Sequence, residues 1–254
     1  MNTTRRSQIK WAHRIHVIHL SKAKERLRTF QSLNKIDGIR FEFVEGIDSA
    51  LLDPAELRRQ KLIKPGTMFR TPGCGLTHRK LWLASLQTRT PLIVCEDDAV
   101  IRRDFRNQFS KCICALPKQW HLLLLGYNFD AMLEVEIIAG VERLSGRFSN
   151  KMLSISRLKN FQKSILPISV LPLRNAFGTP GYAVSPAGAK YLLEQVFPLR
   201  NIRIALPFDG SMLARSMDAV MNGLYSKMKA FACLPPLVVS PNKKDPNARM
   251  VTVD

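Results

Sequence analysis

Apolar residues along the chain fall into short runs that alternate with longer stretches in which apolar and polar positions mix. Residues 14–20 combine β-branched residues with partial alternation, which is typical of a strand. The next stretch predicts a helix capped by Ser21, because its apolar residues recur on one side at Leu27, Phe30 and Leu33. Apolar residues within 41–47 then mark a second strand. Strand, helix and strand in this order predict a βαβ unit.

The same rhythm continues over most of the chain. Further strands are expected at residues 92–95, 120–125, 178–185 and 231–240, and further helices at 77–87, 105–116, 152–165, 186–196 and 209–219. Residues 49–72 predict a short helix and a loop, residues 128–175 lose the regular rhythm apart from one amphipathic helix, and the polar tail from Pro241 is expected to be mobile. The sequence therefore predicts an α/β fold, with a mixed, mostly parallel sheet flanked by helices in a single domain.

One of the predicted strands ends in three consecutive acids, because the apolar run 92–95 is followed at once by Glu96, Asp97 and Asp98. Ligands of open α/β sheets bind at the carboxyl ends of strands. Adjacent carboxylates repel one another unless a cation, arginines or water compensate them, so the run is either a solvated acidic turn or a site for Mg²⁺ or Mn²⁺. Side chains alternate along extended backbone, so Glu96 and Asp98 are expected to point the same way, towards the metal, with Asp98 the direct ligand.

A second candidate is the stretch 72–78, which reads PGCGLTH. Its glycines allow a backbone to approach a ligand closely, and Thr77 is expected to cap the following helix, whose free N–H groups suit an anion. His78 either contacts a bound phosphate or fills the helix start. Asp209 also has two interpretations, because it follows an apolar step: it is either a general base or a helix N-cap.

Composition adds a strong charge imbalance. The chain has 39 Lys plus Arg against 20 Asp plus Glu, a net charge of +19, which favours anionic partners such as nucleic acid, acidic lipid head groups or phosphorylated substrates. The stretch 151–163 is then either an ordinary helix with a solvated basic face or a membrane-surface or acceptor-binding element. The five cysteines lack the spacing of a disulfide framework, so we expect reduced thiols in a cytosolic protein. We find no signal peptide and no apolar run long enough to span a membrane.

Several motifs, in one order along the chain, are similar to those of a known family. They are residues 17–20 with Arg26, residues 72–78, residues 95–99 with Phe105, residues 181–192, and residues 207–209. As a set the motifs resemble glycosyltransferase family 25, the bacterial lipooligosaccharide galactosyltransferases and their collagen-modifying relatives, over residues 14–240. The chain departs from the family pattern at His19, where Asn is usual, at Thr77, where Ser is usual, and at Cys95, where the family has another apolar residue.

The resemblance implies a GT-A fold, an inverting mechanism, a UDP-hexose donor and usually Mn²⁺ (or Mg²⁺). It implies transfer of a hexose, galactose before others, to a lipooligosaccharide or lipopolysaccharide acceptor by an enzyme bound peripherally to the cytoplasmic face of the inner membrane. The donor half is expected at residues 14–127, the acceptor half at 128–240 and a polar tail at 241–254. The residues expected to bind the donor are His19, Leu20, Arg26, Asp48, Gly73, Thr77, His78, Glu96 and Asp97, with Glu96 and Asp98 on the metal and Asp209 as general base.

Two other classes of protein stay open at this stage. A nucleic-acid-binding protein would account for the charge of +19, although we find no recognised binding motif and no ladder of aromatic residues among the basic runs. A metal-dependent nuclease or phosphotransferase could use residues 96–98, although a second acidic cluster that would pair two metals is not evident.

Overall fold

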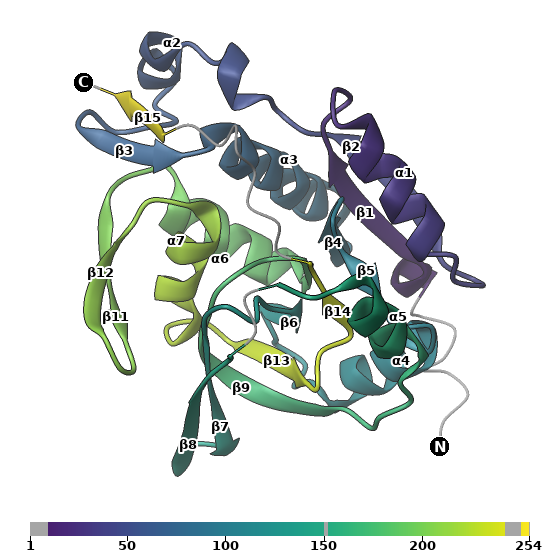
Figure 1. The fold of residues 1–254 in the computed structure, drawn as a ribbon. Helices are drawn as coiled ribbons and strands as arrows, with labels where there is room; N and C mark the ends of the chain where they lie inside the picture. The colour runs from purple at the N-terminus through teal and green to yellow at the C-terminus, as the bar shows by residue number, and fades with distance from the viewer. Residues whose placement is uncertain (1–9, 150–151, 242–249, 254) are drawn as a thin grey trace.

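The computed structural model describes residues 10–149, 152–241 and 250–253. Its centre is a nine-stranded sheet (Figure 1). In spatial order the strands are β2 (Arg40–Glu45), β1 (Arg14–His19), β4 (Leu92–Glu96), β10 (Gly181–Val184), β6 (Leu122–Gly126), β13 (Ala230–Leu234), β9 (Ser169–Ala176), β7 (Met132–Ile138) and β8 (Glu142–Arg147).

The predicted α/β class is confirmed, but the sheet is mostly antiparallel rather than mostly parallel. β1 runs parallel to β2 and β4, and β13 runs parallel to β6, while β10 lies antiparallel between β4 and β6. The apolar runs could not reveal this, because a strand covered on both faces reads as continuously apolar in either direction. In β4, for example, Ile93 and Cys95 pack on one face of the sheet and Val94 packs on the other.

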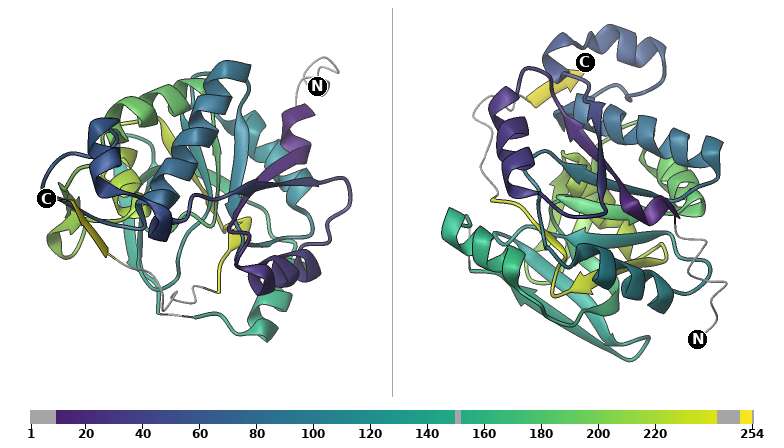
Figure 2. Two further views of the ribbon diagram at one scale, coloured as in Figure 1. Left: turned by 90° about the horizontal axis from the view of Figure 1, so that it is seen from above. Right: turned by 90° about the vertical axis from the view of Figure 1, so that its right-hand side faces the viewer.

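Helices cover both faces of the sheet (Figures 1 and 2). One face packs against α3 (Pro72–Thr88), α6 (Pro186–Val196) and α7 (Met217–Tyr225), and the other packs against α1 (Lys24–Leu33) and α4 (Phe105–Ala115). The helix predicted at 186–196 is confirmed, with a proline in its first turn and the Ser185 hydroxyl accepting a hydrogen bond from the N–H of Gly188 at 3.0 Å. No helix of the described residues combines the length and apolarity that a membrane span requires.

Two predicted helix starts are wrong. α1 begins at Lys24 without a side-chain cap, and Ser21 instead donates hydrogen bonds from its N–H and hydroxyl to the Glu45 carboxylate. α3 begins at Pro72, so Thr77 lies inside the helix and does not cap it. Ser21 thus binds the side chain of Glu45 at the end of β2, and the Thr77 hydroxyl binds the backbone of Gly73 and of Ile47. Partners as distant in sequence as Glu45 and Ile47 are invisible in a local pattern.

The stretch before α3 holds more structure than a short helix and a loop. It contains a 3-10 turn η3 (Ser49–Leu51), the helix α2 (Pro54–Arg59) and a strand β3 (Thr67–Arg70) that was not predicted. β3 pairs with β15 (Met250–Val253), which lies beside it in Figure 1. The described end of the tail is therefore a strand, against the prediction of a mobile tail, whereas residues 242–249 and 254 lie outside the described residues.

Two further predictions change in the second half of the chain. Residues 128–175, where only one amphipathic helix was predicted, contain that helix as α5 (Ile155–Lys163), and also the hairpin of β7 and β8 and the strand β9. Residues 202–214 form a hairpin of β11 (Ile202–Leu206) and β12 (Gly210–Ala214), so the predicted helix opening at Asp209 is wrong. Large apolar side chains recur at every second position, Ile202, Ile204 and Leu206, with exposed residues between them, which is the period of a strand. The proline and acid that follow suggested a helix start but lie in the turn of the hairpin.

Candidate active site

The carboxyl ends of β1, β2 and β4 meet at one edge of the sheet, because these neighbouring strands are parallel. Ile18 of β1 stands opposite Glu96 of β4 and Val44 of β2. The N–H of Gly46 donates to the carbonyl of His19 at 2.8 Å, and the loops that follow are joined by an ion pair between Lys22 and Asp48. Most of the residues expected to bind a donor are thereby gathered at this edge: His19, Leu20, Arg26, Asp48, Glu96 and Asp97.

Asp97, the middle acid, is compensated by groups from β1 and α1. Its side chain is buried, and Oδ2 lies 3.2 Å from Nδ1 of His19 and 3.3 Å from Nε of Arg26. The Arg26 side chain is 46% exposed, so its guanidinium stays at the surface of the edge while it pairs with the buried carboxylate. Asp97 thus holds a half-exposed cation at the place where the strand ends meet.

The outer acids, Glu96 and Asp98, accept hydrogen bonds from hydroxyl groups, and neither forms an ion pair with a described residue. The Thr179 hydroxyl donates to Oε1 of Glu96 at 2.7 Å, and the Ser240 hydroxyl donates to Oδ2 of Asp98 at 2.6 Å. Oδ1 of Asp98 is buried and has no hydrogen-bond partner among the described residues. Ser240 follows β14 (Val238–Val239), which pairs with β5 (Val100–Ile101), so both hydroxyls come from segments far away in the sequence.

The electrostatics of these two acids fit a cation site. Burial, followed by the charge of Asp98, raises the pKa of Glu96 to about 8, and burial also raises the pKa of Asp98. The described residues contain no group of three or more His, Cys, Asp or Glu side chains that could hold a metal by themselves. Two carboxylates, one of which has a buried oxygen without a hydrogen-bond partner among the described residues, nevertheless suit a hard divalent ion that completes its shell with phosphate oxygens and water.

The start of α3 is clamped against the loop that follows β2. The N–H of Gly73 donates to the Ser49 hydroxyl at 2.9 Å, and a Cβ at Gly73 would lie 2.0 Å from the carbonyl oxygen of Ile47, so only glycine fits. The Thr77 hydroxyl donates to the carbonyl of Gly73 and accepts from the N–H of Ile47, each at 2.8 Å. Gly73 and Thr77 therefore fix the helix start against the neighbouring strand end.

His78 lies in the second turn of α3 and points into the protein core. Its ring is fully buried, and Nδ1 lies 2.8 Å from the hydroxyl of Tyr182, which also accepts a hydrogen bond from Nε1 of Trp82 at 3.0 Å. Burial lowers the pKa of His78 to about 4, so the ring is neutral at physiological pH. This position favours the packing interpretation of His78, and its contact with a donor phosphate stays a prediction.

A fourth carboxylate, Asp218 at the start of α7, was not singled out from the sequence. Its Oδ2 accepts from the N–H of Gly178 at 3.1 Å and its Oδ1 accepts from the Ser216 hydroxyl at 2.5 Å. Thr179, the next residue after Gly178, binds Glu96, and the charge of Asp218 contributes to the raised pKa of Glu96. Asp218 therefore faces the acids at the end of β4, and its signal in the sequence was the Ser-Met-Asp step that opens an apolar helix.

Asp209 lies elsewhere, in the turn between β11 and β12. Its side chain is 48% exposed and forms an ion pair with Arg147 of β8. Since Asp209 opens no helix, the N-cap interpretation is wrong, while its role as general base stays a prediction.

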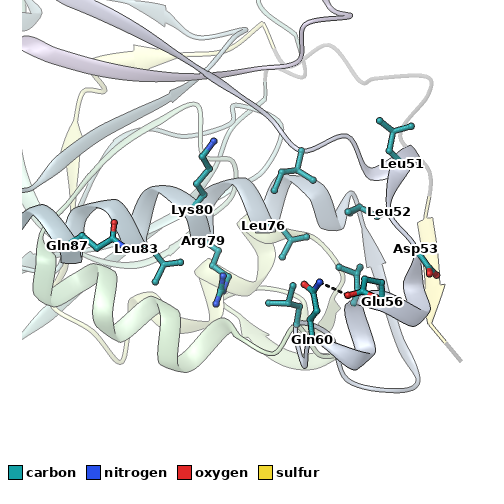
Figure 3. Close-up of a pocket in the computed structure, with 13 residues that line it drawn as sticks. Leu51, Leu52, Asp53, Glu56, Gln60, Leu76, Arg79, Lys80, Leu83 and Gln87 are labelled. Atoms are coloured by element: carbon teal, nitrogen blue, oxygen red, sulfur yellow. Dashed lines mark hydrogen bonds between the residues drawn. The ribbon is translucent and has the colours of Figure 1, made fainter.

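One cavity of the described residues lies away from the acids at the end of β4. It has a volume of about 670 Å³ and lies between α3 and the η3–α2 segment, where leucines, Arg79 and Lys80 line it (Figure 3). None of Glu96, Asp97 and Asp98 borders this cavity. A search for concave surfaces alone would thus have indicated the face beside α3 and α2, whereas the charges and hydrogen bonds indicate the end of β4.

Comparison with known protein families gives a match over residues 12–212, to glycosyltransferase family 25, described as LPS biosynthesis proteins. The chain belongs to glycosyltransferase family 25. The family 25 match includes β1, the start of α3, the acids of β4 and Asp209, and it ends before Asp218. Membership implies a glycosyltransferase of lipopolysaccharide biosynthesis, with a nucleotide-sugar donor and a lipopolysaccharide acceptor. A search of curated proteins returned no match.

Proposed function

We propose that the protein transfers a hexose, galactose before glucose, from a UDP-sugar to a lipooligosaccharide or lipopolysaccharide acceptor with inversion at the sugar carbon. The observation that carries this proposal is the pair Glu96 and Asp98, two partly buried carboxylates that form no ion pair with a described residue, at the end of a parallel strand. Family membership favours a transferase over the nucleic-acid-binding and phosphotransferase alternatives. Galactose, UDP and inversion come from the resemblance of the motifs.

Glu96 and Asp98 would hold Mn²⁺ or Mg²⁺, which when bound would supply Lewis-acid stabilisation of the departing diphosphate. Thr179 and Ser240 orient the two carboxylates, because each donates a hydrogen bond to one of their oxygens. Asp97 keeps His19 and Arg26 in place, and the half-exposed guanidinium is suited to a phosphate oxygen. Glu96 must lose its proton before it can hold a cation, so its raised pKa makes cation binding release protons.

Direct displacement with inversion also needs a base that takes the proton of the acceptor hydroxyl. The motif resemblance nominates Asp209, which forms an ion pair with Arg147 on an exposed hairpin. Asp218 is the second candidate, supported by its position across residues 178–179 from Glu96. A carboxylate has about four lone-pair positions, so the two hydrogen bonds that Asp218 accepts leave room for a substrate hydroxyl.

For the acceptor side we propose peripheral binding to the cytoplasmic face of the inner membrane. The net charge of +19 supports attraction to anionic lipid and to phosphate on the acceptor. Around α5, exposed apolar side chains such as Met152, Ile155 and Ile165 lie close in sequence to Lys159 and Lys163, a combination suited to a membrane surface. Lys151, which belonged to the predicted basic stretch, lies outside the described residues.

A donor screen tests the proposal. Purified protein is incubated with truncated lipooligosaccharide and, separately, with UDP-galactose, UDP-glucose, GDP-mannose and CMP-sialic acid, and release of the nucleotide is measured. We expect acceptor-dependent release from UDP-galactose above the other donors, with Asp98→Asn as the inactive control. Release that requires a GDP- or CMP-sugar, or that is unaffected by Asp98→Asn, would contradict the proposed donor site.

A further inference from the structure

A second cavity, of about 370 Å³, lies between the carboxyl end of α1, the turn that follows β5, and α5. It is lined by cationic and neutral polar side chains and by Leu33, and no acid is among them. The polar lining residues are Ser32, Lys35, Arg103, Lys159, Gln162 and Lys163. Four cations around one concave site repel one another, and the low-dielectric walls concentrate their positive potential.

These cations are not neutralised by the protein. None of Lys35, Arg103, Lys159 and Lys163 forms an ion pair within the part of the chain that the structure describes. The nearest acid in sequence to Arg103 is Asp104, and both of its carboxylate oxygens accept hydrogen bonds from the buried guanidinium of Arg102, at 2.9 and 2.6 Å. The positive charge of the cavity therefore remains available to a ligand.

The floor of the cavity is fixed by buried contacts. The Gln162 side chain is 4% exposed and donates from Nε2 to the carbonyls of Leu33 at 2.6 Å and Ile101 at 3.4 Å, while the N–H of Arg103 donates to the carbonyl of Gln162 at 3.0 Å. Next to them Leu158 packs against Val100 and Val239. Hydrogen bonds thus join the three segments that line the cavity, which are the end of α1, the turn after β5, and α5. The cavity is therefore a defined site and not a chance grouping of surface lysines.

We propose that this cavity binds a phosphate group carried by the acceptor, with Arg103 and the two lysines of α5 as its main partners. An arginine fork pairs with phosphate oxygens in two places, and lysines add charge without a fixed geometry. The cavity is also near the donor edge, the proposed donor site at the carboxyl ends of β1, β2 and β4, because Arg103 follows Asp98 by five residues, a backbone span of at most about 18 Å. The assignment of the phosphate to an acceptor rests on the proposed function, whereas the binding of phosphate by the cavity does not.

The test compares two double variants that lose the same charge. Lys159→Gln/Lys163→Gln removes two cations of the cavity and keeps helix-compatible side chains, and Lys111→Gln/Lys118→Gln removes two exposed lysines in and just after α4 that do not line it. Calorimetric titration with inorganic pyrophosphate should show binding at least about tenfold weaker in the cavity variant and unchanged in the control. The same titration of Asp98→Asn, which alters only the donor edge, should match the wild type.

Several results would overturn the inference. Equal weakening in both double variants would mean that net charge alone attracts pyrophosphate, and a loss confined to Asp98→Asn would assign pyrophosphate to the donor edge. Phosphatidylglycerol vesicles form a third arm: a cavity variant that loses vesicle binding but keeps pyrophosphate binding would assign the cavity to lipid and not to the acceptor. A parallel titration with UDP distinguishes the two proposals. Wild-type protein that does not bind UDP would contradict the proposed donor site, but it would not affect the conclusion about pyrophosphate binding in the cavity.

Discussion

Replacing Glu96 by Gln should make the ligand-free protein more stable at alkaline pH while it weakens the donor site. Gln has the size of Glu, and its Oε1 can still accept the hydrogen bond that the Thr179 hydroxyl now donates to Glu96 at 2.7 Å. What the substitution removes is the negative charge beside Asp98 and Asp218, two of the charges that raise the pKa of Glu96. The expected gain in stability is therefore electrostatic and depends on pH.

The sign and size follow from the pKa. The pKa of Glu96 is about 8 in the folded protein against an ordinary value of 4.5, so the folded state binds the proton more tightly than the unfolded chain. Stability from this group is fully present below about pH 4.5 and is lost as the pH rises through about 8. The upper limit of the loss at pH 9 is about 5 kcal/mol, and the partial exposure of Glu96 and its coupling to Asp98 reduce our expectation to about 1–3 kcal/mol.

The assay is urea unfolding at pH 5 and pH 9 in EDTA, for the wild type, Glu96→Gln and a control, Glu45→Gln. Hydrogen bonds from Ser21 lower the pKa of Glu45, so its substitution should bring no gain at pH 9. We expect Glu96→Gln to match the wild type near pH 5 and to exceed it at pH 9, although it binds Mn²⁺ and UDP less well. A Glu96→Gln variant no more stable than the wild type at pH 9 would show that the acids form an ordinary solvated turn.

Three further predictions concern the base, the helix start and the membrane. Asp218→Asn and Asp209→Asn separate the two candidate bases. The variant that lacks the catalytic base should have a kcat lower by about 100-fold or more with unchanged UDP affinity, and the other variant should keep its turnover. Gly73→Ala should lower the free energy of unfolding by about 1–3 kcal/mol in urea, because its Cβ would meet the Ile47 carbonyl, whereas Gly75→Ala, with contacts no closer than 3.6 Å, should not destabilise the protein. In a sedimentation assay, binding to phosphatidylglycerol vesicles should weaken as salt rises.

Each of these predictions has a clear opposite. Full turnover in both Asp→Asn variants would show that neither Asp209 nor Asp218 is the general base. A Gly73→Ala protein as stable as Gly75→Ala would mean that the loop after β2 does not clamp α3. Equal sedimentation with neutral and anionic vesicles would mean that the basic surface around α5 is only solvated.

The cluster of residues at the carboxyl ends of β1, β2 and β4 could be predicted from the sequence because it depends on local patterns that repeat. A strand, a helix and a second strand place β1 and β2 side by side, and the acids that follow β4 then have to lie near His19 and Arg26 once β4 joins the same parallel group. The alternation rule also separated Asp97 from Glu96 and Asp98, whose partners lie on different segments.

The partners of the outer acids could not be predicted in the same way. Thr179 and Ser240 reach Glu96 and Asp98 only because β10 inserts antiparallel beside β4 and because β14 pairs with β5. Neither pairing can be recognised in the local apolar pattern, because side chains alternate with the same period in parallel and antiparallel strands. Asp218 was overlooked for a related reason: the wrong helix start at Asp209 hid the correct one at Met217.

The binding of UDP with and without Mn²⁺ tests the central claim most directly, which is that the acids at the end of β4 hold a cation bound to the donor. Melting temperatures are measured for the wild type and for Asp98→Asn, each with UDP plus Mn²⁺ and with UDP plus EDTA. We predict that UDP raises the wild-type Tm much more with Mn²⁺ than with EDTA, and that Asp98→Asn loses the Mn²⁺-dependent part. An equal rise in EDTA, or a rise that Asp98→Asn keeps in full, would contradict the metal-assisted donor site.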